Sequence, residues 1–210
     1  MPAKAISNSP YNIRNYQPSD FDKYVLLITE AERLNPTGRC ASPQVISEQL
    51  QKPNYSPDQD VFVLWRDNIA GYMDVKRELG IRRVVLDCWV APEHRRRGLA
   101  TKLLSYAVDR AKELGAEVAH VNINESNTVA TSVLHSLSFR LIRQYSELRL
   151  DIAHVGELDI ADTDPHCHYL QPGEEAKLTQ LQNCAFDGAW GYNPNTVEEI
   201  IFRINSSTCS

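Results

Sequence analysis

Residues 84–115 combine an apolar run, a basic turn and an amphipathic pattern in direct succession. Residues 84–90 have the apolar, β-branched character of a buried strand. A turn with three adjacent arginines and Gly98 follows, and apolar residues then recur at helical spacing until Gly115, a typical helix stop. The stretch therefore predicts strand, turn and helix, an order typical of α/β and α+β domains.

The turn has the features of a phosphate-binding site. The first backbone amides of a helix have no intrahelical acceptor and carry partial positive charge, so they bind anions. Gly98 lets the backbone approach a ligand closely. The alternative is a surface loop whose arginines are only solvated. We expect a diphosphate to contact Arg95, Arg96, Arg97, Gly98, Leu99, Ala100 and Thr101.

Two motifs resemble those of the GNAT superfamily of N-acetyltransferases. The order Arg95-x-x-Gly98-x-Ala100 resembles its Arg/Gln-x-x-Gly-x-Gly/Ala signature, at which the family binds acetyl-CoA. Further along, Asn127, Ala130 and Phe139 match the family's Asn-x-x-Ala-x-x-Leu-Tyr-x-x-x-Gly-Phe motif. The resemblance covers residues 11–151.

The resemblance implies a fold and a donor substrate. The fold is a mixed, largely antiparallel sheet flanked by helices, with splayed central strands that hold the acetyl-pantetheine arm of acetyl-CoA. By the same resemblance, the main chain of Cys88, Trp89 and Val90 binds the acetyl group and pantetheine, and Asn127 binds the cofactor arm. Asn127 can equally cap the helix that starts there. Cys88 as an acyl-carrying nucleophile is less favoured than direct transfer, because strand cysteines are usually small buried hydrophobes.

The two motifs do not assign the residues that act as general acid and general base. The second motif has Leu134 and Ser138 where the family often has tyrosine and glycine, and leucine cannot serve as the general acid that protonates CoA. His135 and Tyr145 are alternative acids. The candidates for the general base that deprotonates the acceptor amine are Asp87, Glu78, His120 and Glu125.

Composition excludes several classes of protein. A net charge of −5 and a pI near 5.7 argue against a nucleic-acid-binding surface. The five cysteines include no Cys-x-x-Cys pair, and His166-Cys167-His168 offers too few ligands for a structural zinc site. The chain has neither an apolar run of about 20 residues nor an N-terminal secretion signal. We expect a cytoplasmic protein with no bound metal, nucleic acid or membrane.

Local patterns predict the other elements. We expect a strand over residues 11–16, helices over 18–31 and 42–50, a hairpin of 61–65 with 69–77, a strand over 118–124, a helix over 127–137 and a strand from 139 to about 151.

The chain then begins a similar pattern again. Gln171-Pro172-Gly173-Glu174 parallels Gln17-Pro18-Ser19-Asp20, and residues 197–204 parallel the helix of residues 42–50. We therefore expect a GNAT-like domain over residues 1–151, a linker over 152–166 and a partial second GNAT-like unit over 167–210. The chain could be part of a longer tandem protein, or the last segment could be an appendage on the first domain or an unrelated helical extension.

The resemblance implies an N-acyltransferase. It would move an acetyl group from acetyl-CoA to a primary amine on a small-molecule or peptide acceptor. The alternative is a non-catalytic acyl-CoA-binding module, or a degenerate half of a tandem enzyme. A second GNAT domain or a homodimer would be its protein partner.

Overall fold

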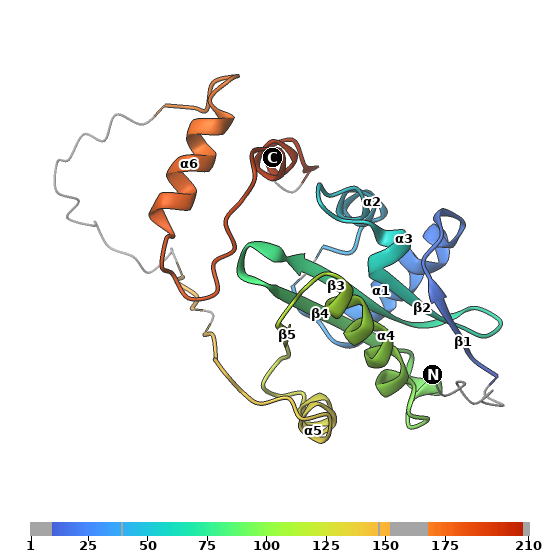
Figure 1. Cartoon of the computed structure of the whole chain (residues 1–210). Coiled ribbons are helices and arrows are strands. Elements are labelled where there is room, and N and C mark those ends of the chain that lie inside the picture. The colour runs from blue at the N-terminus through green and yellow to red at the C-terminus, as the bar shows by residue number, and fades with distance from the viewer. Residues whose placement is uncertain (1–9, 39, 147, 152–167, 208–210) are drawn as a thin grey trace.

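The computed structural model describes residues 10–38, 40–146, 148–151 and 168–207. A five-stranded sheet organises the first domain (Figure 1). Its neighbours are antiparallel except for the last two strands, which are parallel. This confirms the mixed, largely antiparallel sheet. In spatial order the strands are β1 (Asn12–Asn15), β2 (Val61–Trp65), β3 (Ile69–Glu78), β4 (Arg83–Val90) and β5 (Val118–Val121).

Helices cover both faces of this sheet, and short 3-10 turns lie at Pro18–Asp20, Leu79–Ile81 and Pro92–His94. The helices are α1 (Phe21–Leu34), α2 (Pro43–Leu50), α3 (Pro57–Asp60), α4 (Leu99–Glu113), α5 (Thr128–Ser136), α6 (Glu175–Ala185) and α7 (Val197–Ile204).

Strand alternation divides the interior into two cores. Leu99, Leu103 and Ala107 of α4 pack on Val84 and Leu86 of the sheet. The opposite core joins α1 and α2 to β2 and β3; its members include Tyr24, Ile28, Ile46, Val63 and Tyr72. Successive strand residues point to opposite faces, so each strand contributes to both cores. The sheet therefore has an α4 face and an α1 face, on which different chemistry can be placed.

The predicted helix starts are confirmed in atomic detail. The Ser42 hydroxyl accepts a hydrogen bond from the Val45 amide at 3.3 Å, which caps α2. At α7 the Thr196 hydroxyl accepts from the Glu199 amide, and the Glu199 carboxylate accepts from the Thr196 amide at 2.8 Å. Such reciprocal capping satisfies amides that the helix itself cannot pair.

Two sequence predictions about strands are wrong. The strand predicted over residues 118–124 ends at Val121, and residues 139–146 and 148–151 form no strand. A strand requires a neighbour that pairs with its backbone groups. The second segment has none among the described residues, so Leu141, Tyr145 and Leu148 stay exposed although their pattern is strand-like.

The C-terminal helices reproduce the spacing of the first two. α6 begins at Glu175 as α1 begins at Phe21, and α7 spans Val197–Ile204 as α2 spans Pro43–Leu50, at one constant offset. The turn before each pair is also alike. The Gln17 amide donates to Asp20 Oδ2 at 2.9 Å, and the Gln171 amide donates to Glu174 Oε2 at 3.1 Å.

The C-terminal segment lies against the first domain, and Figure 1 shows α7 beside α2. The backbone amide and hydroxyl of Ser207 donate to Glu48 Oε2 at 3.1 and 2.8 Å. Arg83 Nη2 donates to the Gly191 carbonyl at 2.7 Å. The Trp190 ring stacks on His120 with centroids 6.0 Å apart.

In the part of the chain described, no helix combines the length and apolar character needed to cross a bilayer.

Candidate active site

The parting of β4 from β5 is the central feature of the candidate site. The two strands pair only from Arg83 opposite Val118 to Leu86 opposite Val121. β4 then continues to Val90 while paired on its other side with β3. Its last four residues, from Asp87 onward, thus form an open strand edge where backbone groups can bind a ligand. This edge includes Cys88, Trp89 and Val90, the predicted pantetheine contacts.

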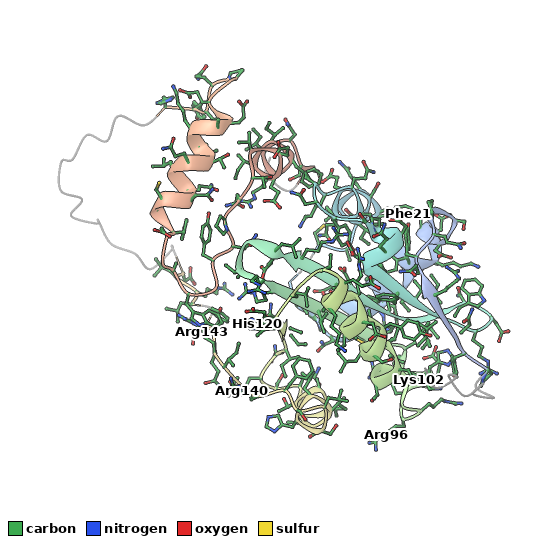
Figure 2. The ribbon with its side chains drawn as sticks, viewed as in Figure 1. Phe21, Arg96, Lys102, His120, Arg140 and Arg143 are labelled. Carbon is green, nitrogen blue, oxygen red and sulfur yellow. The ribbon has the colours of Figure 1, made fainter. Side chains whose placement is uncertain are left out.

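The basic turn follows this edge directly and is braced on both sides. Tyr11 Oη lies 2.8 Å from His94 Nδ1, which ties β1 to the turn. Arg95 Nε donates to the Val90 carbonyl at 2.8 Å, and its guanidinium lies 5.6 Å from the centre of the Trp89 ring. Arg95 therefore shapes the turn. The side chains of Arg96 and Arg97 are exposed, and Figure 2 shows Arg96 pointing away from the fold near Lys102.

Gly98 carries the turn into α4. Its φ of +70° is in the left-handed region, and a β-carbon there would meet nothing within 4 Å. Within the described chain, no loop or capping hydrogen bond uses the backbone amides of residues 96–101. Leu99 is buried in the α4 core and fixes the start of the helix. The turn thus presents open backbone amides at the positive end of a 15-residue helix.

Gly71 lets β3 pack closely against the end of β4, on the side away from the open edge. A β-carbon at Gly71 would lie 2.7 Å from the Trp89 carbonyl oxygen, and backbone atoms cannot yield as side chains can. We expect Gly71→Ala to displace the Trp89–Val90 backbone and to weaken CoA binding about threefold to tenfold, at a stability cost of about 1–3 kcal/mol. Isothermal calorimetry with CoA and urea unfolding measure the two effects. Gly38→Ala is the control for CoA binding, because its cost is backbone strain at a φ of +77° and its β-carbon would meet nothing within 4 Å. Equal CoA affinity of wild type and Gly71→Ala would contradict the expectation.

A carboxylate pair lies on the α1 face, beside the point where the strands part. Asp74 of β3 is the cross-strand partner of Asp87 of β4. Lys76 Nζ lies 3.7 Å from Asp74 Oδ2 and 3.5 Å from Asp87 Oδ2, and the Tyr55 hydroxyl donates to Asp74 Oδ1 at 2.8 Å. Burial raises the pKa of Asp74 to about 6, even though Lys76 and Tyr55 favour its ionised form.

Sequence reasoning identified Asp87 but missed Asp74. The available signal was an acidic residue inside the apolar run of β3, at a position where alternation places it on a buried face. The cross-strand register that brings it opposite Asp87 is not readable from either strand alone.

The other predicted proton carriers lie elsewhere. His120 stacks on Trp190, and burial and the nearby Arg83 lower its pKa. Tyr145 is exposed, 6.4 Å from Trp190 between ring centroids. Figure 2 shows His120 and Arg143 on the side of the sheet where the C-terminal segment lies. Glu125 accepts from Gln144 at 3.3 Å, His135 is exposed on α5, and Glu78 pairs with Arg83.

The remaining predicted residues have simple structural positions. Asn127 Oδ1 accepts from the Ala130 amide at 3.1 Å, so it caps α5 as the sequence allowed. Cys88 reaches solvent, yet its crowded surroundings and Asp87 raise the pKa of its thiol to about 12. The thiol therefore stays protonated at neutral pH, which is unfavourable for a nucleophile.

Metal-binding clusters do not occur within the described residues. Of the predicted weak metal motif, residues 166 and 167 lie outside them, and His168 Nε2 lies 3.2 Å from Glu174 Oε2.

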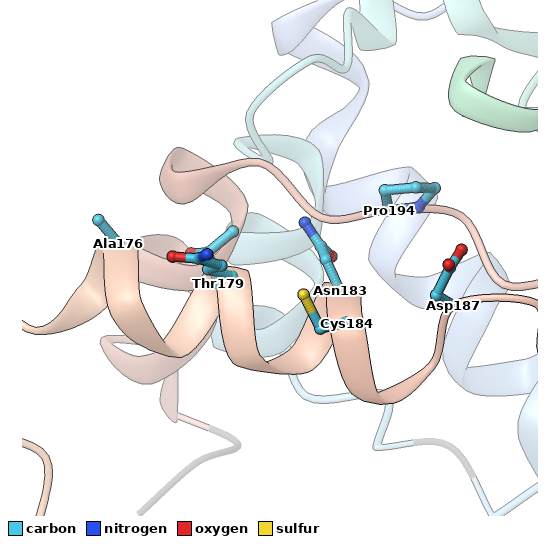
Figure 3. Close-up of a pocket in the computed structure, with 7 residues that line it drawn as sticks. Ala176, Thr179, Asn183, Cys184, Asp187 and Pro194 are labelled. Atoms are coloured by element: carbon cyan, nitrogen blue, oxygen red, sulfur yellow. The ribbon is translucent and has the colours of Figure 1, made fainter.

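A hollow of about 480 Å³ lies between α6 and the segment leading to α7 (Figure 3). The Asn183 and Thr179 side chains on its wall are hydrogen-bonded within the protein.

A sheet that parts beside β4, with a basic turn and open helix amides at the end of that strand, defines an α/β domain whose geometry suits a phosphorylated ligand. The model of the acetyltransferase (GNAT) family matches residues 28–139. The chain belongs to this family.

Similar proteins agree with this assignment. A mycothiol acetyltransferase from Nocardia farcinica is 29% identical over 129 residues, which cover 58% of this chain and 41% of that protein. The chain thus spans less than half the length of this curated relative.

Solved structures show the same fold. A GNAT structure from Sphaerobacter thermophilus aligns with a TM-score of 0.64 at 17% identity, over 95% of this chain and 64% of its own. An aminoglycoside N-acetyltransferase in complex with CoA aligns with a TM-score of 0.53 at 18% identity, over 67% of this chain and 94% of its own.

Proposed function

We propose that the protein is an N-acetyltransferase that moves an acetyl group from acetyl-CoA to a primary amine. The observation that carries this proposal is the sequence of open β4 edge, basic turn and open α4 amides in one continuous stretch. This arrangement suits a thioester arm that ends in a diphosphate. Membership of the GNAT family and the CoA complex of a structural neighbour support acetyl-CoA as the donor.

In this proposal the amides of residues 96–101 bind the diphosphate, because the Arg95 amide, also predicted as a contact, donates to the Pro92 carbonyl at 3.2 Å. The β4 edge at Cys88–Val90 binds pantetheine and the acetyl group. Asn127 contacts the cofactor arm in addition to capping α5. Catalysis then depends on orientation of the thioester and on polarisation of its carbonyl by strand amides.

The direct test mixes the protein, acetyl-CoA and a panel of primary amines, and follows release of the free CoA thiol. We expect amine-dependent release and a mass increase of one acetyl group on the acceptor. Saturable CoA binding without release for any amine would instead favour the non-catalytic acyl-CoA-binding module.

The diphosphate site has a matched pair of glycines for its test. Gly98 and Gly115 lie at opposite ends of α4, with φ of +70° and +69° and open space around both. Valine at either position should cost about 1–2 kcal/mol of stability through the same backbone strain. Only Gly98→Val should also weaken CoA binding, about tenfold or more, because only its side chain would enter the amide site. Calorimetry that gives equal losses for both variants would place the diphosphate elsewhere.

We further propose that residues 167–210 are the opening of a second GNAT-like unit. The linker predicted over 152–166 lies outside the described residues. The constant offset between α1–α2 and α6–α7 and their matching turns support this proposal. A crystal structure in which α6–α7 superposes on α1–α2 would test it; a different crossing of the two helices would contradict it.

A further inference from the structure

The two carboxylates on the α1 face converge on a single ammonium group. Lys76 Nζ is within 3.7 Å of both Asp74 and Asp87, and its side chain is 46% exposed. A long lysine side chain with that exposure can turn toward solvent. The pair is therefore shaped to bind one primary ammonium, and Lys76 is the ammonium that occupies it in this structure.

The buried charge of Asp74 is costly to the fold. Asp74 is 8% exposed, and its folded-state pKa of about 6 exceeds the ordinary value of 3.8, so its ionised form weakens the fold at neutral pH. The Tyr55 hydrogen bond does not require that charge, because Tyr55 could donate equally to an amide oxygen at this position. Costly buried charges concentrate at functional sites.

The position of the pair suits an amine acceptor. Tyr72 and Trp89 pack on the α1 side, so Asp74 and Asp87, each two residues away along its strand, share that face. The diphosphate turn and α4 lie on the opposite face. Asp87 immediately precedes the open edge of β4, so an ammonium beside it lies within one or two residues' rise of the proposed acetyl position. Donor and acceptor can thus meet where β4 and β5 part.

We propose that Asp74 and Asp87 together bind the ammonium group of the acceptor, which is therefore an aliphatic amine that is a cation at neutral pH. This inference rests on the proposed function, whose acceptor class it names. The acceptor displaces Lys76 from the pair. Both carboxylates contact the ammonium. Asp87, the more exposed of the two, takes its proton, and Asp74 holds it in place.

The proton balance of the reaction follows from this arrangement. The ammonium gives one proton to the Asp87 carboxylate, and the freed lone pair attacks the carbonyl carbon of acetyl-CoA. The C–N bond forms and the C–S bond breaks, so CoA leaves as the thiolate. The second proton lost by nitrogen converts the thiolate to the thiol, and Asp87 returns its proton to water.

The pair should also set the pH dependence of the reaction. The rate with an aliphatic amine should rise as the pH passes about 6, where Asp74 ionises. The titratable groups facing the pair are Lys76 on β3, Tyr55 before α3, Tyr24 on α1 and Lys52 after α2, with Asp60 farther away.

The test compares three variants at pH 8, with n-butylamine as acceptor and thiol release as readout. Asp74→Asn and Asp87→Asn should each raise KM for the amine about tenfold or more. Lys76→Met should lower it about threefold to tenfold, because the internal competitor is gone. Asp67→Asn, at a fully exposed carboxylate in the β2–β3 turn, is the control. If Lys76 had only a structural role, Lys76→Met would leave KM unchanged or raise it.

A second readout separates this inference from the proposed function. NMR titration with n-butylammonium measures binding without turnover, and calorimetry with CoA confirms that each variant keeps its donor site. Loss of ammonium binding in both Asp→Asn variants supports the inference even if no amine is acetylated. Turnover with an unchanged KM in both variants would overturn the inference and leave the acetyltransferase activity standing.

Discussion

Replacing Asp60 by alanine is expected to lower the free energy of unfolding by about 3–5 kcal/mol. The Asp60 side chain is fully buried, where it accepts hydrogen bonds from Arg77 Nε at 2.8 Å and Arg110 Nε at 3.0 Å. Its Oδ2 also accepts from the Ser56 amide at 2.9 Å. The carboxylate thereby joins β3, α4 and the start of α3. Its removal leaves two largely buried guanidinium groups without their shared anion, which costs far more than the loss of an exposed ion pair.

Urea unfolding followed by circular dichroism measures this effect. Asp58→Ala on the same short helix is the matched control, because Asp58 is exposed and its loss should change stability by less than about 0.5 kcal/mol. A similar small loss for Asp60→Ala would mean that the two arginines reach water and that this cluster does not hold α4 to the sheet.

Replacing Asp74 by asparagine is expected to have the opposite effect on stability. Its folded-state pKa of about 6 lies above the unfolded value of 3.8, so between these pH values the folded chain binds the extra proton. The contribution of Asp74 to the wild-type free energy of unfolding is therefore fully present below about pH 4. It falls between pH 4 and 6 and is lowest above pH 6. Asparagine carries no charge, so the variant should be more stable by about 2–3 kcal/mol at pH 8, with no gain near pH 4.

Urea unfolding of both proteins from pH 4 to 8 checks this expectation, since the other titrating groups cancel in the difference. A variant that gains stability but loses acceptor binding would show that Asp74 is maintained for function at the expense of the fold. A variant less stable than wild type at pH 8 would show instead that the Lys76–Asp74 contact is a net structural support.

The sequence by itself determined the family and the order of elements that carries the proposed donor site. Strand, turn, glycine and helix over residues 84–115 follow from local rules, because capping, positive φ and apolar periodicity act within a few residues. The same rules placed α2, α4, α5 and α7 correctly. Family motifs at Arg95, Gly98 and Asn127 pointed to acetyl-CoA because they lie within single segments of chain.

Only the tertiary structure brought together the carboxylates of the proposed acceptor site. Asp74 and Asp87 meet through the register of β3 against β4, and this register depends on the whole hairpin and its packing. His120 looked available in its strand until Trp190, far along the chain, was found stacked on it. The segment after Phe139 has a strand-like pattern but no neighbour, because backbone pairing belongs to two strands and cannot be read from one.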